Sequence, residues 1–327
     1  MDNHVRDIVM TTTGAVQIDS ITTIQSLWSG YGTIDRYRLT GSELGSVIVK
    51  HVRLPDRKNH PRGWNTDLSH QRKLHSYQVE TNWYEQWAEI CNEQCRIPHC
   101  LAVEHHEGEV LMILEDLDSS GYPKRLSNIS LSTMDICLNW LAHFHALFMT
   151  EKPQGLWNIG TYWHLDTRPD ELDVMDEGAL KSSAAHLDQI LNNAPYQTFV
   201  HGDAKLANFC FSPAGNQVSA VDFQYVGGGC GMKDVAYFIG SCLDESKCEL
   251  HEKRLLDSYF SSLREALPQY HPKLDVGAVE DAWRPLYEIA WTDFYRFLKG
   301  WSPGHWKIHS YSERIADRVL KRLQDSQ

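Results

Sequence analysis

Residues 197–212 read Gln-Thr-Phe-Val-His-Gly-Asp-Ala-Lys-Leu-Ala-Asn-Phe-Cys-Phe-Ser, and Asp222 follows shortly after them. The apolar residues at either end predict short strands, and the polar residues between them predict a loop. Residues 212–216, Ser-Pro-Ala-Gly-Asn, are rich in turn formers and predict a tight turn. The stretch is therefore expected to fold as a strand, a polar loop, a strand, a turn and a last strand that ends at Asp222.

The predicted loop carries polar residues with the spacing His-x-Asp-x-Lys-x-x-Asn, namely His201, Asp203, Lys205 and Asn208. This spacing is typical of a phosphotransfer catalytic loop. A carboxylate such as Asp203 can orient a hydroxyl that attacks the terminal phosphate of ATP, and Lys205 can neutralise charge on the transferred group. Asn208 and Asp222 offer the hard oxygen ligands that Mg²⁺ prefers. A surface loop of scattered polar residues is the alternative, but this many matched positions rarely coincide by chance.

These residues resemble a known group of enzymes. The tripeptide His-Gly-Asp at 201–203, with Asn208, is similar to the catalytic loop of kinase-like small-molecule phosphotransferases. That group includes aminoglycoside phosphotransferases, choline kinases and ecdysteroid-kinase-like proteins. Asp222 stands where kinases have the aspartate of Asp-Phe-Gly, and Gln224 replaces its glycine, as is ordinary for the small-molecule branch. The resemblance covers nearly the whole chain.

The resemblance implies a bilobal, protein-kinase-like α+β fold. Residues 1–117 would form a nucleotide-binding lobe, with an antiparallel sheet and one main helix. Residues 118–327 would form a mostly helical catalytic and substrate-binding lobe. The implied cofactors are ATP and Mg²⁺. The implied acceptor is a hydroxyl of a choline-like amino alcohol, an aminoglycoside or a sterol-like alcohol, and no motif selects one of them. A catalytically inactive pseudokinase that binds a nucleotide or a partner is the alternative; a protein kinase and a zinc-binding adaptor are further ones.

A lysine lies in the middle of the β-branched stretch 45–52. A strand this apolar rarely contains a lysine without a partner, so Lys50 is unusual there. Lys50 resembles the kinase lysine that holds the α- and β-phosphates of ATP; an edge lysine that faces water is the alternative. A helix is expected from about 70 to 91, with Ser69 as its N-cap. By the same resemblance its Glu80 would pair with the lysine, with Glu85 as the other candidate.

Two further segments are candidates for nucleotide binding. Ser29, Gly30 and Gly32 lie in a predicted hairpin turn, where backbone amides can bind phosphates. The match to G-x-G-x-x-G is incomplete, and a plain turn is the alternative. Glu115 and Leu117 end a predicted hairpin and resemble the hinge that meets adenine. Between these segments, residues 54–70 form either a lid near the phosphates or, as we favour, a simple connection.

Glycine-rich residues 227–231 follow Asp222 in place of the long activation segment of protein kinases, which favours a small substrate. Asp234 opens the next predicted helix. It resembles a family aspartate that supports the catalytic loop together with His201. Asp234 could equally act as a helix N-cap, and both roles are compatible.

The stretch 288–306 is dense in aromatic residues and contains acidic ones. Trp291 and Trp301 could bind an amino or quaternary-ammonium group by cation–π contact, and Asp293 is the best acidic contact. The alternative, which we favour for most of these residues, is a helix face that packs into the core.

Composition limits which other classes of function the chain could have. The chain has 327 residues, is 42% hydrophobic and has a net charge of −12, which argues against general nucleic-acid binding and weakly favours cationic or neutral substrates. No apolar run predicts a signal peptide or a membrane span. The eight cysteines lack a secreted spacing and predict a cytoplasmic protein with reduced thiols. A zinc site is possible but not favoured, because the cysteines and histidines at 91–106 lack a Cys-x-x-Cys pair. The oligomeric state is not predicted.

Overall fold

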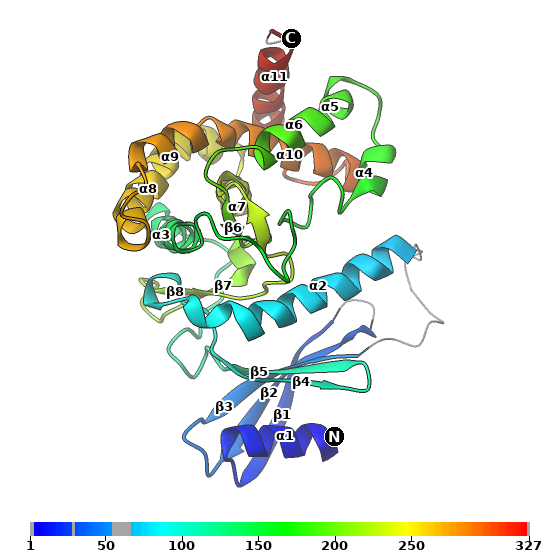
Figure 1. Ribbon diagram of the computed structural model, residues 1–327, viewed down its shortest axis with the longest axis vertical. Helices are drawn as coiled ribbons and strands as arrows, with labels where there is room; N and C mark the ends of the chain where they lie inside the picture. Colours follow the sequence, from blue (N-terminus) through cyan, green and yellow to red (C-terminus); the bar gives the residue numbers. More distant parts are fainter. Residues whose placement is uncertain (1–2, 28–29, 54–66, 326–327) are drawn as a thin grey trace. The chain divides into compact units, whose positions relative to one another are not determined.

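The computed structural model describes residues 3–27, 30–53 and 67–325 (Figure 1). Packing divides the chain into two compact units. The first unit comprises residues 1–92, 96–124 and 210–221. The second unit comprises residues 93–95, 125–209 and 222–327. These units are defined by packing alone, so the predicted functional lobes at 1–117 and 118–327 stay predictions.

The first unit is built on one five-stranded sheet with the order β1-β2-β3-β5-β4, in which neighbouring strands are antiparallel. Its main elements are α1 (Asn3–Thr13), β1 (Gln17–Ser26), β2 (Gly32–Thr40), β3 (Ser46–Val52), α2 (Asp67–Gln86), β4 (Cys100–His106) and β5 (Glu109–Glu115). Figure 1 shows α1 and α2 on opposite sides of this sheet. The predicted α+β fold class, with an antiparallel sheet and one main helix in this region, is confirmed.

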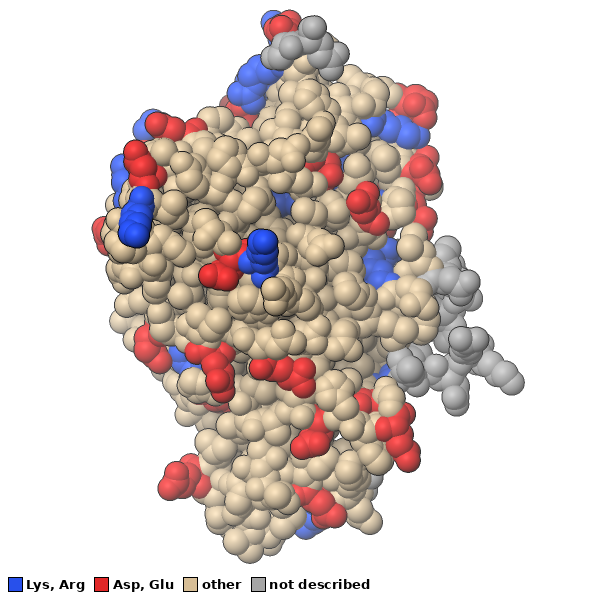
Figure 2. Space-filling view, viewed as in Figure 1, with Lys and Arg blue, Asp and Glu red and all other residues tan. Residues whose placement is uncertain are grey.

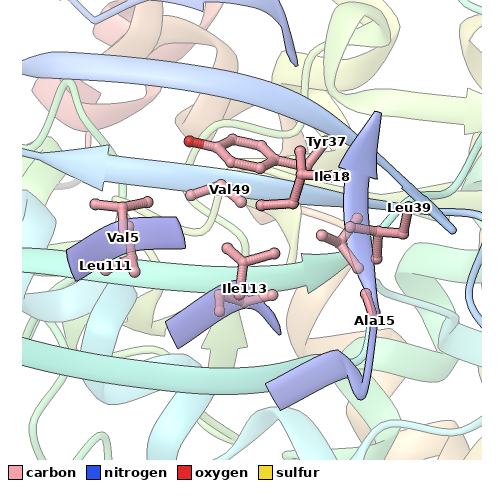
Figure 3. Packing of buried hydrophobic residues seen from close by; sticks show 10 residues of the cluster. Val5, Ala15, Ile18, Tyr37, Leu39, Val49, Leu111 and Ile113 are labelled. Carbon is pink, nitrogen blue, oxygen red and sulfur yellow. The ribbon is translucent and has the colours of Figure 1, made fainter. Parts of the chain in front are cut away.

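One face of the sheet packs against α1. Figure 3 shows the buried side chains of this cluster, which are Val5, Val9, Ala15, Ile18, Tyr37, Leu39, Val47, Val49, Leu111 and Ile113. Side chains alternate between the two faces of a strand, so Val47 and Val49 of β3 face this cluster and Lys50 faces away from it. The alternation turns Lys50 toward the side of the sheet on which α2 lies.

The main helix α2 differs from its predicted bounds at both ends. It begins at Asp67, before the expected N-cap Ser69, and it ends at Gln86 rather than near residue 91. The chain then tightens into a 3-10 turn at Ala88–Ile90, in which the Ile90 nitrogen donates to the Trp87 carbonyl at 3.0 Å. Such tightening at a helix end is common, and sequence periodicity does not register it.

The first unit also contains a segment that is remote in the sequence. Strands β7 (Phe209–Phe211) and β8 (Val218–Ala220) form a two-stranded sheet, and residues 210–221 belong to the first unit. The Phe211 nitrogen donates to the Lys124 carbonyl at 2.8 Å, and the Ala220 nitrogen donates to the Arg96 carbonyl at 3.0 Å. Through these long-range backbone bonds the hairpin packs in the first unit. The predicted catalytic loop that precedes it in the chain belongs to the second unit.

The second unit is mostly helical. Its helices are α3 (Leu131–Leu147), α4 (Pro169–Asp173), α5 (Ala179–Ser182), α6 (Ala184–Asn192), α7 (Met232–Cys242), α8 (Glu245–Tyr270), α9 (Val276–Trp283), α10 (Leu286–Trp301) and α11 (Ser310–Asp325). A two-stranded antiparallel sheet joins β6 (Thr198–Val200) to β9 (Gly227–Gly229). Helices α9 and α10 are separate, because Pro285 between them lacks the N–H that would continue the first helix.

The charge expected from the composition is spread over the surface. Figure 2 shows acidic side chains over much of the face that it presents, with basic ones interspersed. Among the described residues, no helix combines the length and the apolar character needed to cross a membrane.

Candidate active site

The predicted catalytic loop leaves β6 inside the second unit. Its partner β9 brings the backbone after Asp222 alongside, so that Gly202 lies close to Tyr225. Gly202 has a φ of +81°, and a Cβ atom there would lie 2.0 Å from the Tyr225 carbonyl oxygen. Only glycine fits both this left-handed backbone and this close approach. The small residue between the histidine and the aspartate of the motif is thus a structural requirement.

Asp234 holds the start of this loop. Its Oδ2 accepts a hydrogen bond from the His201 backbone nitrogen at 2.5 Å, and its Oδ1 accepts one from the Gly202 nitrogen at 3.0 Å. Its Oδ2 also lies 3.2 Å from Nε2 of His145. The side chain is fully buried, and the N-cap of α7 is Gly231 rather than Asp234. The alternative N-cap role is therefore wrong, and the carboxylate contacts the loop instead.

Asp203 is buried among donors from its own loop. Lys205 Nζ donates to Asp203 Oδ2 at 2.7 Å, and Asn208 Nδ2 donates to the same oxygen at 3.1 Å. The buried Oδ1 atom lacks a hydrogen bond of good geometry from the described part of the chain, although the Tyr237 phenol makes a polar contact with the same carboxylate. Burial raises the pKa of Asp203 above its ordinary value and the nearby Asp222 raises this pKa further, although the Lys205 cation acts in the opposite direction. An oxygen in this state can accept a proton or a hydrogen bond from a bound molecule.

The remaining residues of the motif surround this carboxylate. The Asn208 amide nitrogen also donates to the Asp203 carbonyl at 2.8 Å, so the amide oxygen is the Asn208 atom that can ligate a metal ion. Asp222 adopts a left-handed φ of +71°, and its Oδ1 accepts from Gln224 Nε2 at 2.8 Å. The His201 ring is buried and its Nδ1 lies 3.3 Å from the Asp203 nitrogen. The sequence motif is thus one spatial cluster in the second unit.

In the first unit, the predicted lysine has a partner. Lys50 Nζ lies 2.5 Å from Glu80 Oε2, and both side chains are at most 5% exposed. The other candidate, Glu85, contacts His105 at 3.2 Å instead. The structure therefore distinguishes two carboxylates on α2 that the sequence left open. A buried ion pair between a strand and a helix fixes both side chains in one geometry.

Two of the three residues predicted for the phosphate-binding turn, Gly30 and Gly32, are described. Ser29 lies outside the described residues, whereas Gly30 and Gly32 have positive φ values of +79° and +125°. The Gly30 nitrogen donates to the Leu27 carbonyl at 3.2 Å, and the Leu27 nitrogen donates to the Gly32 carbonyl at 2.8 Å. Gly30 N–H is thus engaged within the turn in this structure. Most of the predicted 54–70 connection also lies outside the described residues.

The predicted hinge residues have partners in the first unit. The Glu115 carboxylate accepts two bonds from Arg96 Nη2, at 2.5 and 2.6 Å, and one from the His99 nitrogen at 2.9 Å. Burial acts to raise the pKa of Glu115, but these donors outweigh it and lower the pKa. Leu117 packs in a small apolar cluster with Tyr122 and Cys210. Arg96 is a contact that sequence patterns did not indicate, because it is remote from Glu115 in the chain.

The three predicted substrate contacts have different surroundings in the second unit. Asp293 is 1% exposed and its Oδ1 accepts from Arg296 at 2.9 Å. Trp291 is also buried and donates to the Ser312 hydroxyl at 3.0 Å. Trp301 is partly exposed and stacks on Phe297 with ring centroids 5.6 Å apart. Burial and internal pairing favour structural roles for Asp293 and Trp291, in line with the alternative of a core-facing helix.

The cysteines and histidines do not gather into a metal site. All eight cysteines are free thiols. Among the described residues, no group of three or more histidine, cysteine, aspartate or glutamate side chains has the geometry to hold a metal ion. The zinc alternative therefore has no support from the described part of the chain.

Two residues near Asp203 have no sequence signal. Tyr237 on α7 and Lys307, in the connection between α10 and α11, both interact electrostatically with the Asp203 carboxylate. Neither belongs to the motif, and Lys307 follows a proline- and glycine-containing turn that has no periodic pattern. Only the packing of α7 and of the 302–309 connection brings them to the loop.

Known structures share this fold. A choline kinase from Cryptosporidium parvum aligns with a TM-score of 0.56 at 11% identity, over 99% of this chain and 96% of its own. The macrolide 2′-phosphotransferase MphH from Brachybacterium faecium aligns with a TM-score of 0.53 at 11% identity, over 96% of this chain and 97% of its own. At such identity the likeness shows the fold alone, which is that of the kinase-like small-molecule phosphotransferases.

Sequence comparison gives the family. No significant match was found among curated proteins. The profile of the ecdysteroid kinase-like family matches residues 58–156 and 164–271, which together make up more than half of the chain. The matched residues include the loop from His201 to Asn208, Asp222 and Asp234. The protein belongs to the ecdysteroid kinase-like family.

Proposed function

We propose that this protein is an ATP- and Mg²⁺-dependent kinase that phosphorylates a hydroxyl group of a small molecule. The observation that carries this proposal is the Asp203 carboxylate, which is buried, has a raised pKa and lies between Lys205, Asn208 and Tyr237. Family membership and the shared fold support a phosphotransferase in general. A choline-like amino alcohol, an aminoglycoside and a sterol-like alcohol are the acceptor classes considered.

Asp203 is proposed to act as the catalytic base. Its Oδ1 would accept the hydrogen bond of the acceptor hydroxyl and so orient the attacking oxygen. As that oxygen bonds to the γ-phosphorus, the bond to the β–γ bridging oxygen breaks and ADP leaves with its electron pair. The hydroxyl proton passes to Asp203. Lys205, which already contacts Asp203, would neutralise charge on the transferred group.

The residues around Asp203 also fit a magnesium ion. The amide oxygen of Asn208 and the carboxylate of Asp222 are hard oxygen donors of the kind that Mg²⁺ takes, and the Asn208 amide nitrogen is already bonded to Asp203. When bound, the ion would neutralise charge on the phosphate oxygens. His201 and Asp234 would support the loop that presents these ligands.

ATP binding is assigned to residues of the first unit. Lys50, oriented by Glu80, would hold the α- and β-phosphates. The turn with Ser29, Gly30 and Gly32 would lie over the phosphates, and Glu115 and Leu117 would belong to the adenine hinge. This assigns nucleotide binding to the lobe at 1–117 and catalysis to the lobe at 118–327. The free thiols support a reducing, cytoplasmic location, and we expect no nucleic-acid or membrane partner.

The test is ADP formation from Mg-ATP, with and without a pool of hydroxyl metabolites. The pool should stimulate turnover, and Asp203→Asn should lower it by about 10²–10⁴-fold, as loss of a catalytic base does. Asp281→Asn, an exposed carboxylate on α9, is the matched control and should leave turnover unchanged. Full activity of Asp203→Asn would contradict the assignment.

A protein that no pool stimulates is then tested for nucleotide binding. Binding without turnover would support the alternative, a pseudokinase that acts as a nucleotide-binding module. Failure to bind Mg-ATP would contradict both functions. A positive pool can be divided until the acceptor is identified.

A further inference from the structure

A lysine occupies a cluster of aromatic rings in the second unit. Lys307 lies between α10 and α11, and its Nζ atom is 4.7 Å from the ring centre of Tyr237, 5.3 Å from that of Phe294 and 5.5 Å from that of Trp306. We call these three rings the aromatic box. Within the described residues, the Lys307 ammonium forms no ion pair and no hydrogen bond. Cation–π contact therefore compensates this cation for part of the lost water, together with attraction by Asp203.

The aromatic box lies beside the proposed base. Burial raises the pKa of the Tyr237 phenol well above its usual range, and the Asp203 carboxylate raises it further. Burial and the Asp203 carboxylate also raise the pKa of Tyr162, whose ring centre is 5.6 Å from that of Tyr237. The Lys307 cation itself is attracted by Asp203 and repelled by Lys205. One wall of the aromatic box thus adjoins the carboxylate that would face the acceptor hydroxyl.

The aromatic box is open to solvent on another side, because Trp306 is 59% exposed and Lys307 is half-buried. Three electron-rich rings open to water and next to a carboxylate would ordinarily attract a cationic ligand. Here the protein's own cation covers them. With Lys205 also present, two positive side chains lie around Asp203, so a cationic acceptor would meet repulsion from both.

We propose that Lys307, by filling the aromatic box next to Asp203, is a specificity-determining residue that makes the acceptor site select neutral or anionic alcohols and reject cationic ones. This inference rests on the proposed function, because it concerns the acceptor of that same site. It narrows the acceptor classes: choline-like amino alcohols and polycationic aminoglycosides are disfavoured, and sterol-like or acidic alcohols are favoured. It also replaces Trp291 and Trp301 as the suggested cation–π contacts.

The first test measures binding of tetramethylammonium by tryptophan fluorescence, without nucleotide. The wild type should show no saturable binding. Lys307→Ala, which vacates the aromatic box, should bind the ion saturably, with a dissociation constant at least about tenfold below the lower limit set by the wild type. The gain should be lost in Lys307→Ala combined with Trp306→Ala. Lys307→Arg should behave as the wild type, and so should Lys321→Ala, an exposed lysine on α11.

The second test compares choline with its neutral carbon analogue 3,3-dimethylbutan-1-ol as ligands of the same proteins. The wild type should prefer the neutral alcohol, and Lys307→Ala should shift the ratio of the two dissociation constants toward choline by about tenfold or more. Lys307→Met keeps an apolar side chain in the aromatic box and should shift the ratio in the same direction. This variant keeps the test valid if Lys307→Ala fails to fold.

Two results would overturn the inference. One is saturable binding of tetramethylammonium to the wild type; the other is binding of tetramethylammonium and choline that stays unchanged in folded Lys307→Ala and Lys307→Met. Neither measurement needs phosphate transfer. A protein that forms no ADP but shows the expected binding would therefore refute the proposed function and still support the inference about Lys307. A kinase that uses choline as readily as the neutral alcohol would refute the inference alone.

Discussion

The carboxylate of Asp234 binds the backbone of the catalytic loop at His201, with 2.5 Å between Oδ2 and the backbone nitrogen. A second bond reaches the Gly202 nitrogen, and all these groups are buried. A carboxylate from the first turn of α7 therefore fixes the start of a loop whose first residues, 201–205, belong to no helix or strand. The position of Asp203 depends on this link, although Asp234 belongs to another element.

Asp234→Ala is expected to destabilise the protein by about 2–5 kcal/mol, because two buried N–H donors lose their acceptor. Urea unfolding would measure this loss. Asp234→Asn keeps one acceptor oxygen and should lose less. Equal stability of Asp234→Ala and the wild type would show that the loop does not depend on this carboxylate.

The ion pair of Lys50 and Glu80 predicts a contrast between two glutamates of one helix. Glu80→Gln leaves the buried Lys50 ammonium without its counter-ion, so we expect KM for ATP to rise by at least about tenfold, as for loss of a buried charged hydrogen bond. Lys50→Ala should have an equal or larger effect. Steady-state kinetics with varied ATP would measure both.

Glu85→Gln is the matched control, because Glu85 contacts the exposed His105 and not Lys50. It should leave KM for ATP unchanged. A larger effect from Glu85→Gln than from Glu80→Gln would show that Glu80 is not the functional partner of Lys50.

Gly202 and Gly215 both have left-handed backbones. Substituting each by alanine distinguishes the cost of backbone strain from the cost of a steric clash. A Cβ atom at Gly202 would lie 2.0 Å from a backbone oxygen, whereas one at Gly215 would meet nothing within 4 Å. Gly215→Ala should cost about 1 kcal/mol from strain alone. Gly202→Ala should cost more than about 2 kcal/mol and abolish turnover, because the loop must move. Thermal unfolding and ADP formation would test this, and equal losses would contradict the steric argument.

Local patterns in the sequence predict the parts of the site that lie close together in the chain. His201, Asp203, Lys205 and Asn208 share one loop, so their spacing alone indicates that they converge. Lys50 was recognised because a lysine inside a β-branched strand needs a partner. These inferences use short-range chemistry. The fold class, which the resemblance carried by the same motif implied, is confirmed.

Contacts between remote residues could not be predicted in the same way. The sequence left Glu80 and Glu85 as alternatives, since only the packing of α2 on the sheet selects one. It offered Asp293 as a substrate contact, whereas the buried Arg296 one turn later pairs with it. Lys307 was missed, because its aromatic partners come from α7, α10 and its own connection. Such pairings depend on tertiary packing, which periodicity does not record.

The raised pKa of Asp203 predicts a conflict between activity and stability. A carboxyl group whose pKa is higher in the folded than in the unfolded protein stabilises the fold at pH values below the ordinary carboxyl pKa. This stabilisation is lost as the pH rises through the pKa of the folded state. Ionised Asp203 therefore destabilises the protein at neutral pH. Asp203→Asn should raise Tm by about 1–4 °C near pH 7 while turnover is lost, and this gain should vanish near about pH 4.

Calorimetry of both proteins between these pH values would measure this difference. The Lys205 cation opposes the effect, so Lys205→Met should lower Tm at neutral pH by leaving the Asp203 charge uncompensated. A lower Tm for Asp203→Asn than for the wild type at pH 7 would show that the contact with Lys205 outweighs burial.

The proposed charge of Lys307 predicts that acceptor selectivity depends on pH. Burial lowers the pKa of Lys307 to about 8, so the side chain is mostly charged near pH 7 and mostly neutral near pH 9. Repulsion of choline relative to 3,3-dimethylbutan-1-ol should therefore weaken severalfold between these pH values in the wild type.

Lys307→Met carries no charge at position 307, so its ratio of the two dissociation constants should not change with pH. Lys307→Arg should keep its preference for the neutral alcohol throughout. The ratio of the two dissociation constants, measured across this range, isolates the charge, because a purely structural role of Lys307 would change both ligands equally. A wild-type ratio that does not change with pH would show that the ammonium is not what the ligand meets.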